Sequence, residues 1–207
     1  MQEFLTISLI HFVAVASPGP DFAIVVRHSV SFGRRAAMYT SIGIGLGILI
    51  HVTYSIVGLS VLIKTTPWLY SAISYLAAAY LVYLAVGALK SGPPKAVAEG
   101  TQSPVAASTM TAKKALWIGF LTNGLNPKAT LFFLSLFTAF IDVNTPMSVK
   151  LGYGIYLAVA TGAWFCFLSY LLSTSKVAQL IGSKGYWLDR TMGVLLIGLA
   201  LKLVWSA

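Results

Sequence analysis

The amino-acid sequence predicts an all-α integral membrane protein of about six transmembrane helices, arranged as two inverted three-helix repeats whose first helices are broken. Three observations lead to this fold class. Hydrophobic residues make up 57% of the 207 residues and charged residues only 9%, whereas a soluble domain carries about a quarter charged residues. Apolar runs of about 20 residues, the length that crosses a bilayer, recur along the chain. Two of these runs contain a polar break with proline.

The apolar segments are each long enough, at about 1.5 Å per residue, to cross most or all of a hydrocarbon core about 30 Å thick. Their expected bounds are Phe4–Val26, Met38–Ile63, Trp68–Leu89, Ala115–Ile141, Leu151–Leu172 and Trp187–Trp205. Tryptophan stands at several segment ends, where its amphipathic ring favours the headgroup level. The mean hydropathy of +0.83 agrees with a chain that lies largely in lipid.

Residues 91–112 divide these segments into two sets of three. This stretch is rich in Pro, Ser, Ala and Gly, a composition typical of a flexible linker. We expect a first three-helix repeat over residues 1–90, a cytoplasmic linker over 91–112 and a second three-helix repeat over 113–207. Because each set has an odd number of spans, the second set enters the membrane from the opposite side, as in an inverted repeat.

Lysine and arginine concentrate in alternate connections, which predicts the orientation of the chain. The richer side holds Arg27, Arg34, Arg35, Lys90, Lys95, Lys113, Lys114, Lys176, Lys184 and Arg190, against Lys64 and Lys150 on the other. The richer side is expected to be cytoplasmic, so both termini are predicted to be periplasmic. If the first segment re-enters instead, five full spans remain and the N-terminus is cytoplasmic. The net charge of +9 is therefore interpreted as an orientation signal and not as a nucleic-acid-binding surface.

The two polar breaks are the strongest indication of a site. The first reads SPGPD at residues 17–21 and the second NPKA at residues 126–129, each about a dozen residues into its segment. Proline removes a backbone donor and stops the helix, which leaves unpaired amides and carbonyls. In hydrocarbon such groups are tolerated only around a buried or wet cavity. A single break is more often a simple proline kink, but two breaks in corresponding positions favour a binding site.

Each break carries one charged residue, Asp21 in the first and Lys128 in the second. An ionisable residue at the centre of a membrane helix costs about 2.5–3.5 kcal/mol on insertion scales, so its presence indicates function. We expect the two charges to pair across the pseudo-symmetry axis when the site is empty. The alternative is a purely structural salt bridge that holds the halves together.

The two motifs together resemble the lysine-exporter (LysE-type) superfamily. SPGPD in the first segment is followed by GFLTNGLNPKA in the fourth, at residues 119–129, and the pattern is most similar to the homoserine/threonine-efflux branch. The resemblance covers the whole chain in length, segment order and central linker. It implies export of amino acids or close derivatives across the bacterial inner (plasma) membrane, energised by the proton gradient.

An amino-acid zwitterion fits the chemistry of the breaks. Half-helix amides and Lys128 suit its carboxylate, while free carbonyls and Asp21 suit its ammonium. The predicted substrate-binding residues are Ser17, Pro18, Gly19, Pro20, Asp21, Asn123, Asn126, Pro127 and Lys128. Asp21 and Lys128 are also the predicted proton-coupling residues, with a proton on Asp21 replacing the substrate ammonium. Small neutral substrates such as threonine and homoserine are expected, and basic or branched-chain amino acids are the alternatives.

Other residues favour no second function. Cys166 is the single cysteine, which excludes thiol redox chemistry and thiolate metal sites. His11 and His51 either relay protons or make ordinary interior hydrogen bonds, and neither belongs to a nucleophile–base motif of an intramembrane enzyme. Gly43 and Gly47 are expected to allow close helix packing and not to form a nucleotide loop. No metal or cofactor is predicted, and the apolar surface permits a homodimer.

Overall fold

The computed structural model describes residues 2–17, 19–65, 67–90, 92, 110–142, 144–172 and 186–206, and its elements there are α-helices. They are α1 (Gln2–Ala16), α2 (Pro20–Ser31), α3 (Gly33–Thr65), α4 (Pro67–Leu89), α5 (Ala112–Gly124), α6 (Pro127–Phe140), α7 (Met147–Leu172) and α9 (Tyr186–Ser206). The predicted all-α class is confirmed for these residues. Most of the predicted linker over 91–112 lies outside the described residues.

Two described helices are long and apolar enough to cross a membrane by themselves, Gly33–Val57 within α3 and Met147–Leu172 in α7. The pair α1 and α2 passes the same test as one span with a bend of 52°. Ser74–Leu89, Pro127–Phe140 and Gly193–Lys202 are shorter apolar helices. Up to three spans are therefore supported in the part of the chain that the structure describes, and the six-span arrangement stays a prediction.

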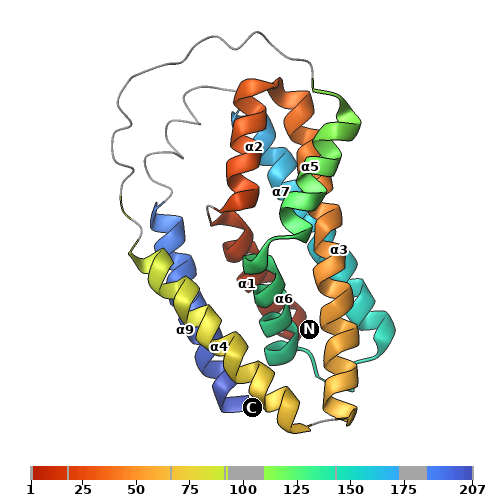
Figure 1. The fold of residues 1–207 in the computed structure, drawn as a ribbon, viewed down its shortest axis with the longest axis vertical. Helices are drawn as coiled ribbons and strands as arrows, with labels where there is room; N and C mark the ends of the chain where they lie inside the picture. The colour runs from red at the N-terminus through yellow and green to blue at the C-terminus, as the bar shows by residue number, and fades with distance from the viewer. Residues whose placement is uncertain are drawn as a thin grey trace.

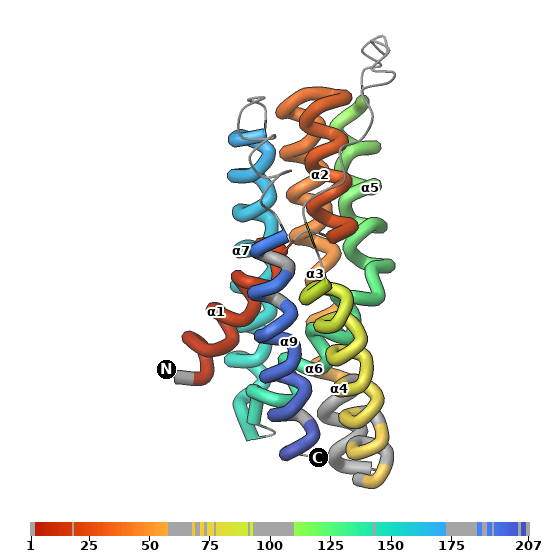
Figure 2. Tube along the Cα trace, turned by 90° about the vertical axis from the view of Figure 1, so that its left-hand side faces the viewer, coloured from red at the N-terminus to blue at the C-terminus, as the bar shows by residue number. Residues whose placement is uncertain are grey.

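The predicted first and fourth segments are each divided at the expected place. The chain leaves α1 after Ala16 and starts α2 at Pro20, and it leaves α5 after Gly124 and starts α6 at Pro127. Beyond its break, α2 continues in the direction of α1 toward the end of the bundle where α3 begins (Figures 1 and 2). This course favours a broken span over a segment that returns to its own side.

Corresponding helices of the two sets run in opposite directions in Figure 1: α1 and α2 rise where α5 and α6 descend, α3 descends where α7 rises, and α4 rises where α9 descends. An inverted repeat requires this relationship, and the repeat itself stays a prediction. The α2–α3 turn, followed by Arg34 and Arg35, lies at the same end of the bundle as the start of α5, which carries Lys113 and Lys114. These two basic stretches thus share one end, as the orientation prediction requires, while Lys176 and Lys184 of the third lie outside the described residues.

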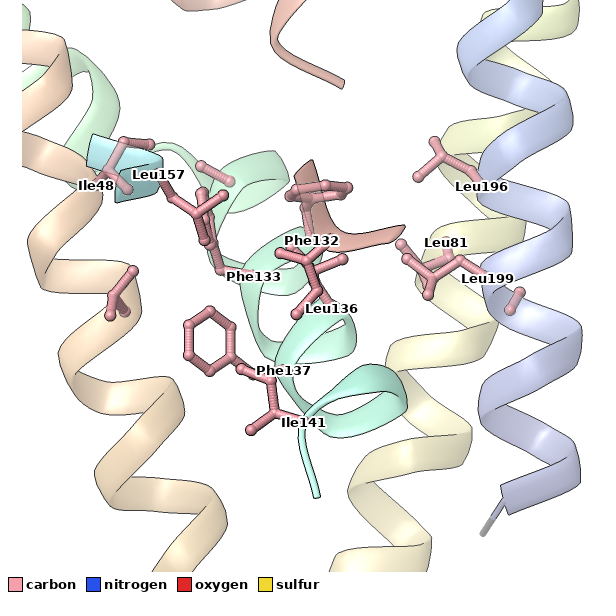
Figure 3. Packing of buried hydrophobic residues seen from close by; sticks show 14 of the residues in the cluster. Ile48, Leu81, Phe132, Phe133, Leu136, Phe137, Ile141, Leu157, Leu196 and Leu199 are labelled. Carbon is pink, nitrogen blue, oxygen red and sulfur yellow. The ribbon is translucent and has the colours of Figure 1, made fainter. Parts of the chain in front are cut away.

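The hydrophobic core is centred on α6. Figure 3 shows Phe132, Phe133, Leu136 and Phe137 of this helix lying between α3 on one side and the paired helices α4 and α9 on the other. Leu81 of α4 and the α9 side chains Leu196 and Leu199 belong to the same buried cluster. The half-helix beyond the second break is therefore held on both sides by apolar packing.

Helix α3 packs closely against α5 and α7 because glycines replace side chains at the contacts. A Cβ atom at Gly43 would overlap the carbonyl oxygen of Leu116 in α5, and one at Gly119 of α5 would overlap that of Thr40. On another side of α3, a Cβ at Gly45 would come within 2.9 Å of the Ala158 carbonyl oxygen in α7. The expected role of Gly43 in close helix packing is confirmed.

Candidate functional site

The two helix breaks open onto one small cavity. Its volume is about 50 Å³, room for about three to five water molecules. It is lined by Ala14, Val15, Ser17, Gly19, Pro20, Asp21, Phe22, Ile48, Asn123, Asn126, Lys128, Ala129, Phe132, Phe133, Thr161 and Phe165. The polar lining comes almost entirely from the breaks, and the apolar lining comes from the helices around them.

The first break is built by glycine and proline. Helix α1 closes with a hydrogen bond from the Ser17 amide to the Val13 carbonyl (3.2 Å), and α2 opens with Gly19 as its N-cap and proline directly after it. Proline at the first helical position costs no hydrogen bond there. Gly19 has no side chain with which to cap the amides of α2. The N-terminus of α2, where helix dipoles concentrate positive charge, therefore ends at the cavity without a side-chain cap.

At the second break, the side chain of Asn126 caps the helix that follows. Asn126 is the N-cap of α6, and its Oδ1 accepts a hydrogen bond from the Lys128 amide at 3.0 Å. The Asn123 carbonyl near the end of α5 accepts from the Asn126 amide at 2.8 Å and from Nε2 of His51 at 2.8 Å. This carbonyl therefore has two hydrogen-bond donors. A histidine from α3 is the second donor to this carbonyl, which receives no amide hydrogen bond from Pro127.

Asp21 joins the two breaks. Its Oδ2 accepts hydrogen bonds from Nδ2 of Asn123 at 2.9 Å and from Nδ2 of Asn126 at 3.3 Å. Its Oδ1 is buried and has no hydrogen-bond partner among the described residues, and the same holds for Oδ1 of Asn123. A buried acceptor without a donor costs free energy. The site therefore presents unused acceptors that a bound cationic donor would satisfy.

Lys128 lies in the first turn of α6, and its ammonium group is close to Gly19. A Cβ atom added to Gly19 would be 3.5 Å from the Lys128 Nζ atom, so the ammonium sits beside the uncapped start of α2. The positive end of the α2 dipole and the Lys128 ammonium lie together here and do not neutralise each other. This part of the cavity is therefore favourable for an anion.

The apolar wall is formed by the phenylalanines at positions 132, 133 and 165 together with Ile48. Phe133 lies between two buried histidines, with ring centroids 5.8 Å from His11 and 5.9 Å from His51. His11 Nε2 makes a 3.0 Å hydrogen bond with the Thr161 hydroxyl. The interior hydrogen bonding expected for both histidines is present.

The structure thus brings most of the predicted site residues together. The predicted residues that line the cavity are Ser17, Gly19, Pro20, Asp21, Asn123, Asn126 and Lys128. Pro127 is exposed and is not among the lining residues, so its part is to start α6. Pro18 lies outside the described residues. That these residues bind a substrate stays a prediction.

Sequence reasoning missed Thr161 and the apolar wall, because a threonine or a phenylalanine inside an apolar run carries no signal that it faces a cavity. It also left undecided what His51 contacts. Gly47 contacts the site as well: a Cβ there would be 2.8 Å from Oδ1 of Asn123. Among the described residues no group of His, Cys, Asp and Glu side chains could hold a metal ion.

Comparison with known proteins agrees with the motifs. The family model of the LysE type translocator matches residues 12–207. The chain is 30% identical to the threonine efflux protein of Escherichia coli K12 over 100% of its length and 99% of the relative. It is 33% identical to the leucine efflux protein of Salmonella typhimurium over 91% of its length and 88% of the relative. No solved structure matches the chain.

The family match covers the two breaks, the cavity and nearly the whole chain, and relatives are matched from end to end. The resemblance carried by SPGPD and GFLTNGLNPKA is therefore confirmed, and the alternative of an intramembrane enzyme is wrong because the matched proteins are translocators. The chain belongs to the LysE type translocator family of membrane transporters.

Proposed function

We propose that this protein exports small neutral amino acids of the threonine or homoserine type from the cytoplasm across the bacterial inner membrane, in exchange for protons. Full-length relatives are named threonine efflux proteins, and another relative is named a leucine efflux protein. The observation that carries the proposal is the placement of Asp21, with one unused carboxylate oxygen, and Lys128 on one cavity between two broken helices.

The zwitterion is bound at two corners of that cavity. Its ammonium donates to Oδ1 of Asp21, which has no donor among the described residues, and to the nearby Oδ1 of Asn123. Its carboxylate sits at the uncapped start of α2, beside Gly19, and is neutralised by the Lys128 ammonium. An isolated ionised group is very costly to bury, so each charge of the substrate requires such a partner.

Coupling follows from competition at Asp21. When the substrate leaves toward the periplasm, a proton binds the Asp21 carboxylate in place of the ammonium, and Asn123 and Asn126 hold the side chain in both states. The proton leaves toward the cytoplasm before the next substrate binds. One charge moved through 100 mV supplies about 2.3 kcal/mol, enough for a gradient of roughly 50-fold.

A branched-chain amino acid is the second candidate substrate. The phenylalanine-lined wall suits an apolar side chain, and the leucine efflux relative is as similar as the threonine efflux relatives. A basic substrate is not supported by the described lining, because Asp21 is its single acidic residue. The exposed apolar surface permits a homodimer without requiring one, and crosslinking in membranes would test it.

Transport into inverted membrane vesicles tests the proposal. Uptake of labelled threonine, homoserine, leucine and lysine is measured with and without a pH gradient that is acid inside. Threonine and homoserine are expected to accumulate only with the gradient, and Asp21→Asn is expected to abolish that accumulation. Asp142→Asn is the matched control, because Asp142 is exposed just beyond α6 and its Oδ1 accepts a hydrogen bond from the nearby Asn144 amide. Gradient-driven uptake by Asp21→Asn at the wild-type level would refute the coupling.

A further inference from the structure

Among the lining residues that come from outside the helix breaks, the single polar side chain is that of Thr161 in α7. The other polar lining residues all lie in the breaks or directly beside them. They are Ser17, Asp21, Asn123, Asn126 and Lys128. If the breaks bind the two charged groups of an amino acid, the substrate side chain contacts the remaining lining residues. These include phenylalanine rings, Ile48 and one hydroxyl group, that of Thr161.

The Thr161 hydroxyl is held in place by His11. The two side chains are buried, with 1% and 3% of their surfaces exposed, and the Oγ1–Nε2 distance is 3.0 Å. The His11 ring is fixed in turn by packing against Phe133, which also lines the cavity. A hydroxyl has one donor and two acceptor positions, so a single bond to His11 leaves it able to bond a ligand.

We infer that Thr161 is the residue by which this transporter selects substrate side chains that carry a hydroxyl group, and that His11 is its positioning residue. The inference rests on the proposed function and adds the chemical feature that the site recognises. A substrate hydroxyl in the cavity meets the Thr161 hydroxyl and gains a hydrogen bond. A substrate with a methyl group at that place gives the buried Thr161 hydroxyl no hydrogen bond, so the hydroxyl keeps only its bond to His11.

The effect of that one contact on selection is modest and measurable. A net hydrogen bond changes an affinity by roughly three- to tenfold. Sites that hydrogen-bond a substrate hydroxyl reject the analogue that lacks it more strongly than apolar pockets reject an added hydroxyl. Threonine and valine are nearly isosteric and differ by one hydroxyl against one methyl, so they are the matched pair of substrates.

The experiment tests both substrates, threonine and valine, on wild type and on a variant in which Thr161 is itself replaced by valine. Wild type and Thr161→Val are compared for initial export of threonine and of valine, and for ligand-induced thermal stabilisation of the purified full chain. Wild type is expected to favour threonine by roughly tenfold, and Thr161→Val to lose that preference by losing threonine affinity and not by gaining overall rate. Thr161→Ser keeps the hydroxyl and is expected to keep the preference.

Two variants at His11 and one control variant separate a positioning role from an effect on folding. His11→Gln retains a donor and acceptor amide near the Nε2 position and is expected to keep the threonine preference, whereas His11→Leu loses it. Ser169→Ala is the control, since Ser169 is a buried hydroxyl two turns along α7 that pairs with Ser41 at 3.0 Å outside the cavity. Its threonine-to-valine ratio is expected to equal that of wild type.

The outcomes distinguish this inference from the proposed function. If wild type exports threonine and valine and the ratio is the same in Thr161→Val, the role of Thr161 is refuted while amino-acid export stands. If wild type neither exports nor is stabilised by any of the amino acids tested, the proposed function fails and the inference fails with it. If His11→Leu keeps the full preference, His11 does not position Thr161.

Discussion

The backbone carbonyl of Asn123 accepts a hydrogen bond from Nε2 of His51 at 2.8 Å. A carbonyl only accepts, so Nε2 carries the proton, and in a neutral imidazole Nδ1 is then the acceptor. The hydroxyl of Tyr54 lies 2.6 Å from Nδ1 and is the donor. This chain of bonds ties the end of α5 to the middle of α3, and it holds the residue whose side-chain amide reaches Asp21.

Replacing His51 is expected to loosen the second break. His51→Leu leaves the Asn123 carbonyl with the Asn126 amide alone as donor and is expected to lower the free energy of unfolding by about 0.5–1.5 kcal/mol, the net contribution of one hydrogen bond. His51→Gln, whose side-chain amide can still donate near the Nε2 position, is expected to recover part of that loss. Thermal unfolding of the purified protein in detergent measures both.

Tyr54→Phe serves as the graded control for this prediction. It removes the donor to Nδ1, but the Thr130 hydroxyl remains 3.5 Å from the same atom, so a smaller loss of stability than in His51→Leu is expected. Equal stability of His51→Leu and wild type would show that the Asn123 carbonyl does not need this donor.

Gly47 of α3 is expected to be needed for the geometry of Asp21. A Cβ atom at this position would lie 2.8 Å from Oδ1 and 2.9 Å from Cβ of Asn123, so Gly47→Ala displaces the side chain whose Nδ2 bonds Asp21. We expect the half-saturating threonine concentration for export to rise by roughly tenfold, in line with the cost of overpacking. Export kinetics in inverted vesicles measure the change.

Gly87→Ala in α4 is the matched control, because a Cβ atom there would meet nothing within 4 Å. It is expected to transport like wild type. Unchanged half-saturation in Gly47→Ala would mean that Asn123 tolerates displacement, and the proposed part of Asn123 in the site would have to be dropped.

The contact between α3 and α5 is expected to be the most sensitive to added volume. A Cβ atom at Gly119 would overlap the carbonyl oxygen of Thr40, a backbone atom that cannot rotate away. Gly119→Ala is therefore expected to lower the unfolding temperature clearly, with about 1–3 kcal/mol lost. Gly152→Ala in α7, which meets nothing within 4 Å, is expected to change it little, and equal melting of the two variants would contradict the close packing.

Orientation can be tested at the two ends of the bundle. The α2–α3 turn lies at one end and the α6–α7 connection at the other (Figure 1). In a Cys166→Ala background, a cysteine at exposed Ser31 is expected to resist an impermeant thiol reagent added to intact cells, and one at exposed Asn144 is expected to react. The opposite pattern of labelling would reverse the predicted topology.

The helix breaks are readable in the sequence because proline and glycine act on the backbone where they stand. Pro20 and Pro127 each begin a half-helix, and Asn126 caps the second one through its own side chain. The close packing of Gly43 is readable for the same reason, since a glycine inside an apolar helix marks a near neighbour. The helix ends are less accurate: α3 starts at Gly33 and takes in Arg34 and Arg35, and α7 starts at Met147.

The partners across the site are not readable, because they lie far apart in the chain. His51 is 72 residues from the carbonyl that it satisfies, and His11 is 150 residues from Thr161. The sequence therefore places Asp21 and Lys128 near the centre of their segments, but it cannot say that Asn123 and Asn126 share one oxygen of Asp21. Those contacts depend on how α3 brings the two breaks together.

The glycine-lined faces of α3 have a consequence for biosynthesis. Both surfaces that fit them, on α5 and on α7, are translated after α3. A nascent chain that ends before residue 112 contains neither α5 nor α7. The glycine-lined faces of α3 therefore have no helix to pack against at that stage. The first half of this transporter is therefore synthesised before its packing partners, and the cavity lacks part of its lining until α7, with Thr161 and Phe165, has been made.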